Sequence, residues 1–176
     1  MLESQAIRTV SSKKDPSRPL AVLMCGTAGS GKTTLSKKLE MEGFTRFSID
    51  EEVWVNFGRY GIDYPAEEYR ANLDKAHIIL FEKMLKQIKA GGDIVVDSSF
   101  WRRSERNRYK QAVEDAGGIS QIIYLKVEQD VLYERVRIRN SRFDANAAFP
   151  ITREVLTSFI NSFEVPAGEG ELVIDQ

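Results

Sequence analysis

The amino-acid sequence predicts an α/β domain built on a parallel sheet with helices on both faces. Three observations support this fold class. Short, continuous apolar runs occur at residues 20–25, 93–97 and 121–127, and such runs are typical of strands buried on both sides. Segments with the apolar spacing of helices separate these runs, and there is no internal repeat. A chain of 176 residues suits one domain with a single sizeable core.

Strands and helices alternate along most of the chain. Residues 1–18 are polar, and Pro16 and Pro19 argue against regular structure, so we expect a flexible lead-in before a domain over residues 19–176. Residues 140–150 show no clear periodicity and are expected to form a loop. The expected strands lie at 20–25, 45–50, 93–97, 121–127 and 171–175. The expected helices lie at 33–42, 66–90, 102–116, 130–140 and 152–163, the last capped by Thr152.

The charge balance and the single cysteine limit the function classes. Lys and Arg together number 25 and Asp and Glu 26, which gives a formal net charge of −1. A protein that binds long nucleic acid is usually more basic, although a local basic groove is compatible with this balance. No apolar stretch reaches the roughly 18 residues of a membrane span, and no signal-peptide pattern opens the chain. Cys25 has no partner for an internal disulfide, and we therefore expect a cytoplasmic protein.

A glycine-rich turn follows the first expected strand and fits G-x-x-x-x-G-K-[ST], the pattern of the phosphate-binding P-loop. Glycines let the backbone approach a ligand closely, so that successive N–H groups point at phosphate oxygens. Lys32 adds a charge that reaches the β- and γ-phosphates, and the Thr33 hydroxyl ligates Mg²⁺. The sequence therefore predicts a bound nucleoside triphosphate with Mg²⁺. The predicted nucleotide-binding residues are Gly26, Thr27, Ala28, Gly29, Ser30, Gly31, Lys32, Thr33 and Thr34.

Three classes of P-loop protein compete for this motif. A GTPase would carry the guanine-reading string Asn-Lys-x-Asp, and the nearest string, at residues 72–75, has the wrong order. A motor or AAA-type ATPase would carry an apolar strand that ends in Asp-Glu, whereas Asp97 is followed by Ser98. A kinase needs no water-activating Glu, only a group that holds the acceptor hydroxyl and cations that cover the transferred phosphoryl group. The sequence offers both and favours a kinase.

Four blocks between residues 20 and 175 support this class: GTAGSGKTT, FSID, IVVDSSFWRRSERNR and YLKVEQDVLYERVRIRN. In this order they resemble the small P-loop kinases related to zeta toxin, chloramphenicol phosphotransferase, gluconate kinase and the kinase domain of polynucleotide kinase. The resemblance implies a three-layer domain with a five-stranded parallel sheet in the order 2-3-1-4-5. It also implies an ATP-dependent phosphotransferase that moves the γ-phosphoryl group to a hydroxyl of a small molecule.

Two alternatives to a small-molecule kinase remain open. A polynucleotide 5′-hydroxyl kinase would need a basic channel for the strand, so its affinity should fall steeply with salt. A non-catalytic ATP-binding regulator would bind ATP and phosphorylate no alcohol. None of the four blocks identifies the acceptor.

Two aspartates end expected strands, at the sheet edge where ligands bind in open α/β sheets. An Asp at the position of Asp50 contacts the acceptor hydroxyl and serves as base in the resembled kinases; otherwise Asp50 is a surface residue that caps the next helix. Asp97 either holds Mg²⁺ through water or binds substrate. We predict Asp50 as a catalytic and substrate-binding residue and Asp97 as a metal and substrate residue, with their division of roles left open.

Arginines follow the third and fourth expected strands. The resemblance implies that an arginine shortly after the third strand binds substrate, and Arg106 is predicted for this role. Arg135 and Arg139 lie four residues apart in an expected helix, and their fork-shaped guanidinium groups suit phosphate oxygens. The resemblance places them in a lid around residues 135–150, where they are predicted to be catalytic. Their alternative is a role as ion-pair partners on a helix surface.

Residues 53–69 are rich in aromatic side chains. Trp54, Phe57, Tyr60 and Tyr64 either line an acceptor pocket beside Asp50 or pack an inserted pair of helices. The sequence does not decide between these two interpretations.

Overall fold

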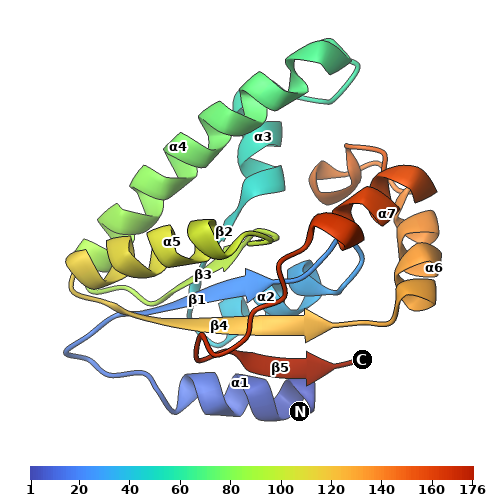
Figure 1. Ribbon diagram of the computed structural model, residues 1–176. Helices are drawn as coiled ribbons and strands as arrows, with labels where there is room; N and C mark the ends of the chain where they lie inside the picture. The colour runs from blue at the N-terminus through green and yellow to red at the C-terminus, as the bar shows by residue number, and fades with distance from the viewer.

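The five strands of the central sheet all run parallel. The computed structural model describes residues 1–176, and its strand order is β2-β3-β1-β4-β5 (Figure 1). This order confirms the sheet that the sequence resemblance implied. The strands are β1 (Leu20–Cys25), β2 (Thr45–Ser48), β3 (Ile94–Asp97), β4 (Ile119–Lys126) and β5 (Leu172–Asp175).

Helices cover both faces of the sheet, as the alternation of elements predicted. The first face carries α1 (Glu3–Ser11) and α2 (Lys32–Met41), and the second carries α3 (Ile49–Phe57), α4 (Tyr69–Lys89) and α5 (Arg103–Asp115) (Figure 1). The remaining helical segments are α6 (Gln129–Arg139), α7 (Arg153–Ser162) and the 3₁₀ turns η1 (Ala66–Glu68) and η2 (Ala145–Ala147). None of the helices combines the length and the apolar character needed to span a bilayer.

Strand β1 explains why the core lies on both faces. Successive side chains of a strand point to opposite faces, and all six residues of β1 are buried. One face receives Ala21, Leu23 and Cys25, and the other receives Leu20, Val22 and Met24. The continuous apolar run is therefore the pattern of a central strand with a helix layer on each side.

The N-terminal segment corrects one prediction. Residues 1–18 were expected to lack regular structure, but Glu3–Ser11 forms α1, and Ala6 and Val10 are completely buried against the first face of the sheet. These two residues lie four apart and form an apolar stripe on an otherwise polar helix. The prolines follow the helix rather than interrupt it, so they gave no reason to exclude it.

Strand β2 is shorter than predicted, and this changes the setting of Asp50. The strand ends at Ser48, whose hydroxyl accepts a hydrogen bond from the Glu51 backbone N–H and caps α3. Helix α3 therefore begins at Ile49, and Asp50 lies in its first turn rather than at the end of the strand. The prediction of a strand over residues 45–50 was wrong for its last two residues.

Helices α6 and α7 form a small unit beyond the carboxyl ends of β1 and β4 (Figure 1). They share an apolar cluster of their own, separate from the two clusters of the sheet. Its buried members are Leu132, Val136, Ile151 and Leu156. The segment between the two helices includes η2, in a region that the sequence predicted to be a loop.

Candidate active site

The predicted P-loop folds as the turn between β1 and α2. Gly26, Gly29 and Gly31 have φ angles of 148°, 81° and 96°, values that residues with a side chain rarely adopt. Because α2 begins at Lys32, the positive end of its dipole faces the turn. The Lys32 Nζ donates a hydrogen bond to the Thr27 carbonyl oxygen at 2.8 Å, which holds the ammonium group across the turn. This geometry suits a bound phosphate.

Replacing Gly29 with alanine should weaken ATP binding by about tenfold or more, because the left-handed backbone alone costs a non-glycine residue about 1–2 kcal/mol. An added Cβ would also lie 3.0 Å from Val136 Cγ2 and 3.3 Å from the Leu132 carbonyl oxygen of α6. Gly61→Ala is the matched control, since Gly61 has a φ of 68° and a Cβ there meets nothing within 4 Å. Titration calorimetry with ATP measures both; no loss of affinity in Gly29→Ala would contradict the phosphate-binding role of this turn.

Two carboxylates act on Lys32, one at the end of β3 and one in the first turn of α3. Burial lowers the pKa of the Lys32 amino group, and the charges of Asp97 and Asp50 oppose this shift. Asp97 ends β3 and pairs in register with Ser48, two residues before Asp50. The two predicted aspartates therefore lie on the same side of the turn as Lys32, at the carboxyl edge of the sheet.

Asp50 has the environment of a base. Burial raises the pKa of its carboxyl group to about 6, and the Arg139 guanidinium is the main group that opposes this shift. The Asp97 charge raises it further, and Lys32 lowers it. A carboxylate with a pKa close to neutral pH is both ionised and able to accept a proton. The side chain is thus suited to the role that the sequence predicted for it.

Arg46 joins Asp97 to the site and was missed in the sequence. Its Nη2 donates to Asp97 Oδ2 at 2.6 Å, and its Nη1 donates to both carboxylate oxygens of Glu51 at 2.8 Å. The side chains of Arg46 and Asp97 are each 4% exposed. A charged residue inside a strand that packs between two helix layers is the signal that could have revealed it. Asp97 is therefore one partner of a buried ion pair as well as a neighbour of Lys32.

The residues beside the turn fit a magnesium ion. Asp97 accepts hydrogen bonds at Oδ2 from Arg46 and from the Ser36 hydroxyl, and its Oδ1 has no protein partner. The Thr33 hydroxyl has no protein partner either. Mg²⁺ usually takes one or two oxygen ligands from a protein and keeps several waters, so this donor set is sufficient.

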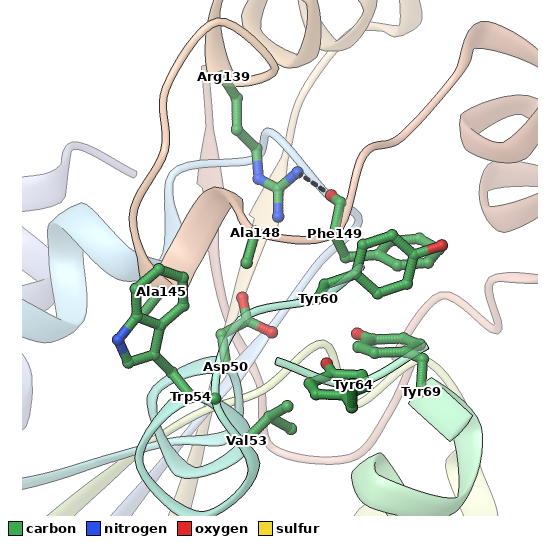
Figure 2. Close-up of a pocket in the computed structure, with 11 residues that line it drawn as sticks. Asp50, Val53, Trp54, Tyr60, Tyr64, Tyr69, Arg139, Ala145, Ala148 and Phe149 are labelled. Carbon is green, nitrogen blue, oxygen red and sulfur yellow. Dashed lines mark hydrogen bonds between the residues drawn. The ribbon is translucent and has the colours of Figure 1, made fainter. Parts of the chain in front are cut away.

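The two predicted lid arginines have different partners. Arg139 donates from Nε to the Asn146 carbonyl oxygen and from Nη1 to the Phe149 carbonyl oxygen, both at 2.9 Å. Its remaining Nη2 points toward the Asp50 carboxylate (Figure 2). Arg135 instead donates to the Gln176 side chain at 2.7 Å and lies 3.4 Å from the Gly29 carbonyl oxygen of the turn. Arg139 thus faces the aspartate, whereas Arg135 covers the glycine-rich turn.

Arg106 does not face the site, and its predicted role in substrate binding was wrong. Its side chain is 1% exposed and forms a two-pronged ion pair with Glu169, with N–O distances of 2.6 and 2.8 Å. Its Nη1 donates to the carbonyl oxygens of Phe100 and Glu164. With four hydrogen bonds inside the protein and almost no exposed surface, the guanidinium has a structural role. The cluster of arginines in the sequence did not distinguish this buried member from its exposed neighbours.

An aromatic pocket lies beside Asp50 and Arg139. Its lining includes three of the four aromatic residues that the sequence proposed for an acceptor pocket: Trp54, Tyr60 and Tyr64. The fourth, Phe57, does not line it. Figure 2 shows the Asp50 carboxylate at its centre, with Arg139 above and the tyrosine rings to one side. The sequence missed two members, Tyr69 from the start of α4 and Phe149 from the segment after η2. Only the fold brings these rings together, since they are separated by 80 residues.

Comparisons with known proteins agree with this fold and site. A family model described as an AAA domain matches residues 22–166. UPF0200 protein PAE1629 of Pyrobaculum aerophilum is 26% identical over 121 residues, which cover 69% of this chain and 67% of the relative. A candidate kinase from Chloroflexus aurantiacus has a TM-score of 0.73 at 22% identity, over 89% of this chain and 88% of that one. A gluconokinase from Sinorhizobium meliloti has a TM-score of 0.60 at 21% identity, over 89% and 82%. The chain shares its fold with small P-loop kinases, which confirms the resemblance seen in its sequence blocks.

Proposed function

The chain belongs to the AAA domain family, but its Asp97 is followed by Ser98 and not by the Glu expected of a hydrolytic AAA-type ATPase. We propose that it is an ATP-dependent phosphotransferase that moves the γ-phosphoryl group of ATP to a hydroxyl of a small molecule. The observation that carries the proposal is that Lys32, the first residue of the helix after the glycine-rich turn, acts electrostatically on the same Asp50 carboxylate that Arg139 faces. Phosphoryl transfer needs positioned cations and a carboxylate for the acceptor hydroxyl, and these three side chains supply them.

The proposed reaction is an in-line transfer in which Asp50 acts as base and the cationic side chains stabilise the developing charge. The acceptor oxygen forms a bond to the γ-phosphorus, and the bond from that phosphorus to the bridging oxygen breaks, so that ADP leaves. The hydroxyl proton goes to the Asp50 carboxylate. Lys32 and Arg139 would stabilise the negative charge that spreads over the transferred group, and Arg135, which donates to the Gly29 carbonyl oxygen, would cover the turn that holds the other phosphates.

Bound Mg²⁺ would neutralise charge on the β- and γ-phosphate oxygens. Thr33 would hold the ion directly and Asp97 through water, with Arg46 fixing the orientation of the Asp97 carboxylate. Ser98 stands where a hydrolytic ATPase would place its water-activating Glu, which supports transfer to an acceptor over hydrolysis.

We propose that residues 135–150 act as the lid of the domain predicted over residues 19–176, to whose core α1 adds Ala6 and Val10. The Asn146 side chain donates to Glu51 at 3.1 Å, so the segment after α6 already contacts α3 across the pocket. Arg139 holds this segment through two backbone carbonyl groups. Closure over the substrates would exclude water, which otherwise competes with the acceptor for the phosphoryl group.

Mass spectrometry of a panel of hydroxylated acceptors, incubated with the protein, ATP and Mg²⁺, tests this proposal. The panel spans nucleosides, sugars, antibiotics, aryl alcohols and a short oligonucleotide. We expect at least one small acceptor to gain a phosphoryl group, and Lys32→Ala to lower the rate by about 10²-fold or more. Phosphorylation of the oligonucleotide alone would favour the polynucleotide kinase. ATP binding with no phosphorylated acceptor would favour the ATP-binding regulator.

A further inference from the structure

The pocket beside Asp50 is filled by side chains of the protein itself. The Phe149 ring stacks on the Tyr69 ring with centroids 4.5 Å apart and an angle of 13° between their planes. The Tyr60 ring packs edge-on against both, at 5.3 and 5.5 Å. The space that remains is about 10 Å³, which holds about one water molecule. An acceptor larger than water therefore cannot enter while all three rings keep these positions.

Phe149 is the ring that is placed to leave. Tyr60 and Tyr69 pack against the large core on the second face of the sheet, whereas Phe149 packs against the small cluster of α6 and α7. Phe149 also lies outside any helix or strand, in the segment that Arg139 holds only through backbone groups. Movement of the lid would carry the Phe149 ring away and leave the two tyrosines in place.

A second observation indicates that this space takes a ligand. The Tyr64 side chain is 7% exposed, and its hydroxyl has no hydrogen-bond partner in the protein. Figure 2 shows the hydroxyl groups of Tyr64 and Tyr69 directed into the pocket, on the side of the Asp50 carboxylate. Buried hydroxyl groups nearly always have a partner, so a polar group from outside the protein is expected here.

The charges of the pocket restrict the ligand further. Asp50 and Arg139 are the two charged residues among its lining. Arg139 uses Nε and Nη1 on backbone carbonyl groups and directs Nη2 toward Asp50, where the transferred phosphoryl group would lie, so the lining holds no second cation for an anionic group on the acceptor itself. A phosphate or carboxylate on the acceptor would instead meet the Asp50 carboxylate. An uncharged molecule is therefore favoured.

We propose that the Phe149 ring occupies the place of the acceptor, and that the acceptor is an uncharged molecule with one aromatic ring and a hydroxyl on a short arm. The ring of the acceptor replaces Phe149 on Tyr69, and its arm places the hydroxyl at Asp50. This inference rests on the proposed function, since it names the acceptor class of the same site.

Titration calorimetry with 2-phenylethanol, in the presence of ADP and Mg²⁺, tests the inference without turnover. Phe149→Ala should bind this probe about two- to tenfold more tightly than the natural chain, because the probe no longer displaces a stacked ring. The backbone carbonyl that Arg139 holds is kept in this variant. Tyr69→Leu should weaken binding by a similar factor, since it removes the wall on which the probe stacks.

Phe159→Ala is the matched control. Phe159 belongs to the same small cluster, but its ring packs edge-on against Trp101 outside the pocket, so affinity should change by less than about twofold. Thermal unfolding of each variant confirms that it is folded. Weaker binding by Phe149→Ala as well as by Tyr69→Leu would make Phe149 part of the wall and overturn the inference.

Three other probes test the acceptor class: glycerol, choline and glucose 6-phosphate. Binding of any of these with an affinity equal to that of 2-phenylethanol would overturn an uncharged aromatic acceptor. Phosphorylation of polyols without binding of aryl alcohols would overturn it too, and would leave the phosphotransferase standing. Aryl alcohols that bind but never gain a phosphoryl group would instead contradict the phosphotransferase and support the site.

Discussion

Asp50→Asn should slow phosphoryl transfer by about 10²–10⁴-fold and at the same time raise the free energy of unfolding at pH 8. Removal of a general base typically costs 10²–10⁴-fold in rate, and asparagine cannot accept the proton. The gain in stability has a different cause. Burial raises the pKa of Asp50 from 3.8 to about 6, so the folded protein holds an ionised carboxylate in an unfavourable place at pH 8.

The sign of this gain follows from proton linkage. The raised pKa of Asp50 contributes to the free energy of unfolding. This contribution is fully present below pH 3.8 and is lost as the pH rises through about 6. At pH 8 the shift of about two units corresponds to at most about 3 kcal/mol, which the uncharged asparagine would recover. Below pH 3.8 the two proteins should have nearly the same stability.

Urea denaturation at pH 3.5 and pH 8 measures this difference. Asp63→Asn is the contrasting control, because ion pairing with Arg59 lowers the pKa of Asp63 to about 2. Its contribution is present above pH 3.8 and is lost as the pH falls through about 2, so this substitution should not stabilise the protein at pH 8. Equal stabilities of the natural chain and Asp50→Asn at pH 8 would mean that the Asp50 carboxylate is well solvated.

The rate should follow the same titration. In the natural chain, kcat/KM for the acceptor should fall about tenfold per pH unit below about pH 6, as Asp50 takes up a proton. The residual rate of Asp50→Asn should lack this limb. A variant that keeps the natural rate would exclude Asp50 as the base.

Local patterns account for the parts of the fold that the sequence could predict. The central strand β1 and the turn after it are contiguous in the chain. A strand buried on both faces requires a continuous apolar run, and a phosphate-binding turn requires its glycines, so both can be recognised from local sequence. Helix α1 was missed because its burial depends on two small apolar residues, Ala6 and Val10, whose partner surface is formed by distant strands. The end of β2 was missed because the Ser48 side chain caps α3, so that the strand ends two residues before its predicted end.

The site residues divide along the same line. Lys32 belongs to a motif, so its place could be predicted, whereas the buried partners Arg46 and Glu169 could not. Asp97 lies 51 residues from Arg46 and Glu169 lies 63 residues from Arg106, so only the fold brings the partners of these two buried pairs together. Arg106 was predicted to bind substrate, a role that needs an exposed side chain, and an arginine on a basic helix is usually exposed. In the structure the segment before β5 encloses its side chain.

Glu169→Ala should destabilise the protein by about 3–5 kcal/mol, the usual result of leaving one charge of a buried pair without its partner. Arg106 and Glu169 are 1% and 2% exposed, so water cannot replace the lost carboxylate. The Phe100 backbone would also lose support. Its φ is +45°, an unusual value for a residue with a side chain, and its carbonyl oxygen accepts from Arg106.

Arg103→Ala is the matched control for this loss. Arg103 lies on the same helix and its Nε is 3.9 Å from Glu169, but its side chain is 59% exposed, so a change within about 0.5 kcal/mol is expected. Urea denaturation gives both values. A loss in Glu169→Ala no larger than that in Arg103→Ala would mean that the pair is open to solvent, and would return Arg106 to the candidates for substrate binding.

The combination of Arg106→Met with Glu169→Leu separates the ion pair from the packing around it. Removing both charges leaves no uncompensated ion, and replacing a buried pair by apolar side chains of similar size is often neutral. The double variant should therefore be more stable than Glu169→Ala alone, although it lacks four hydrogen bonds that Arg106 makes. It should also keep the KM for the acceptor, because the guanidinium has no donor facing the pocket. A raised KM in a folded double variant would mean that Arg106 binds substrate, contrary to its buried position.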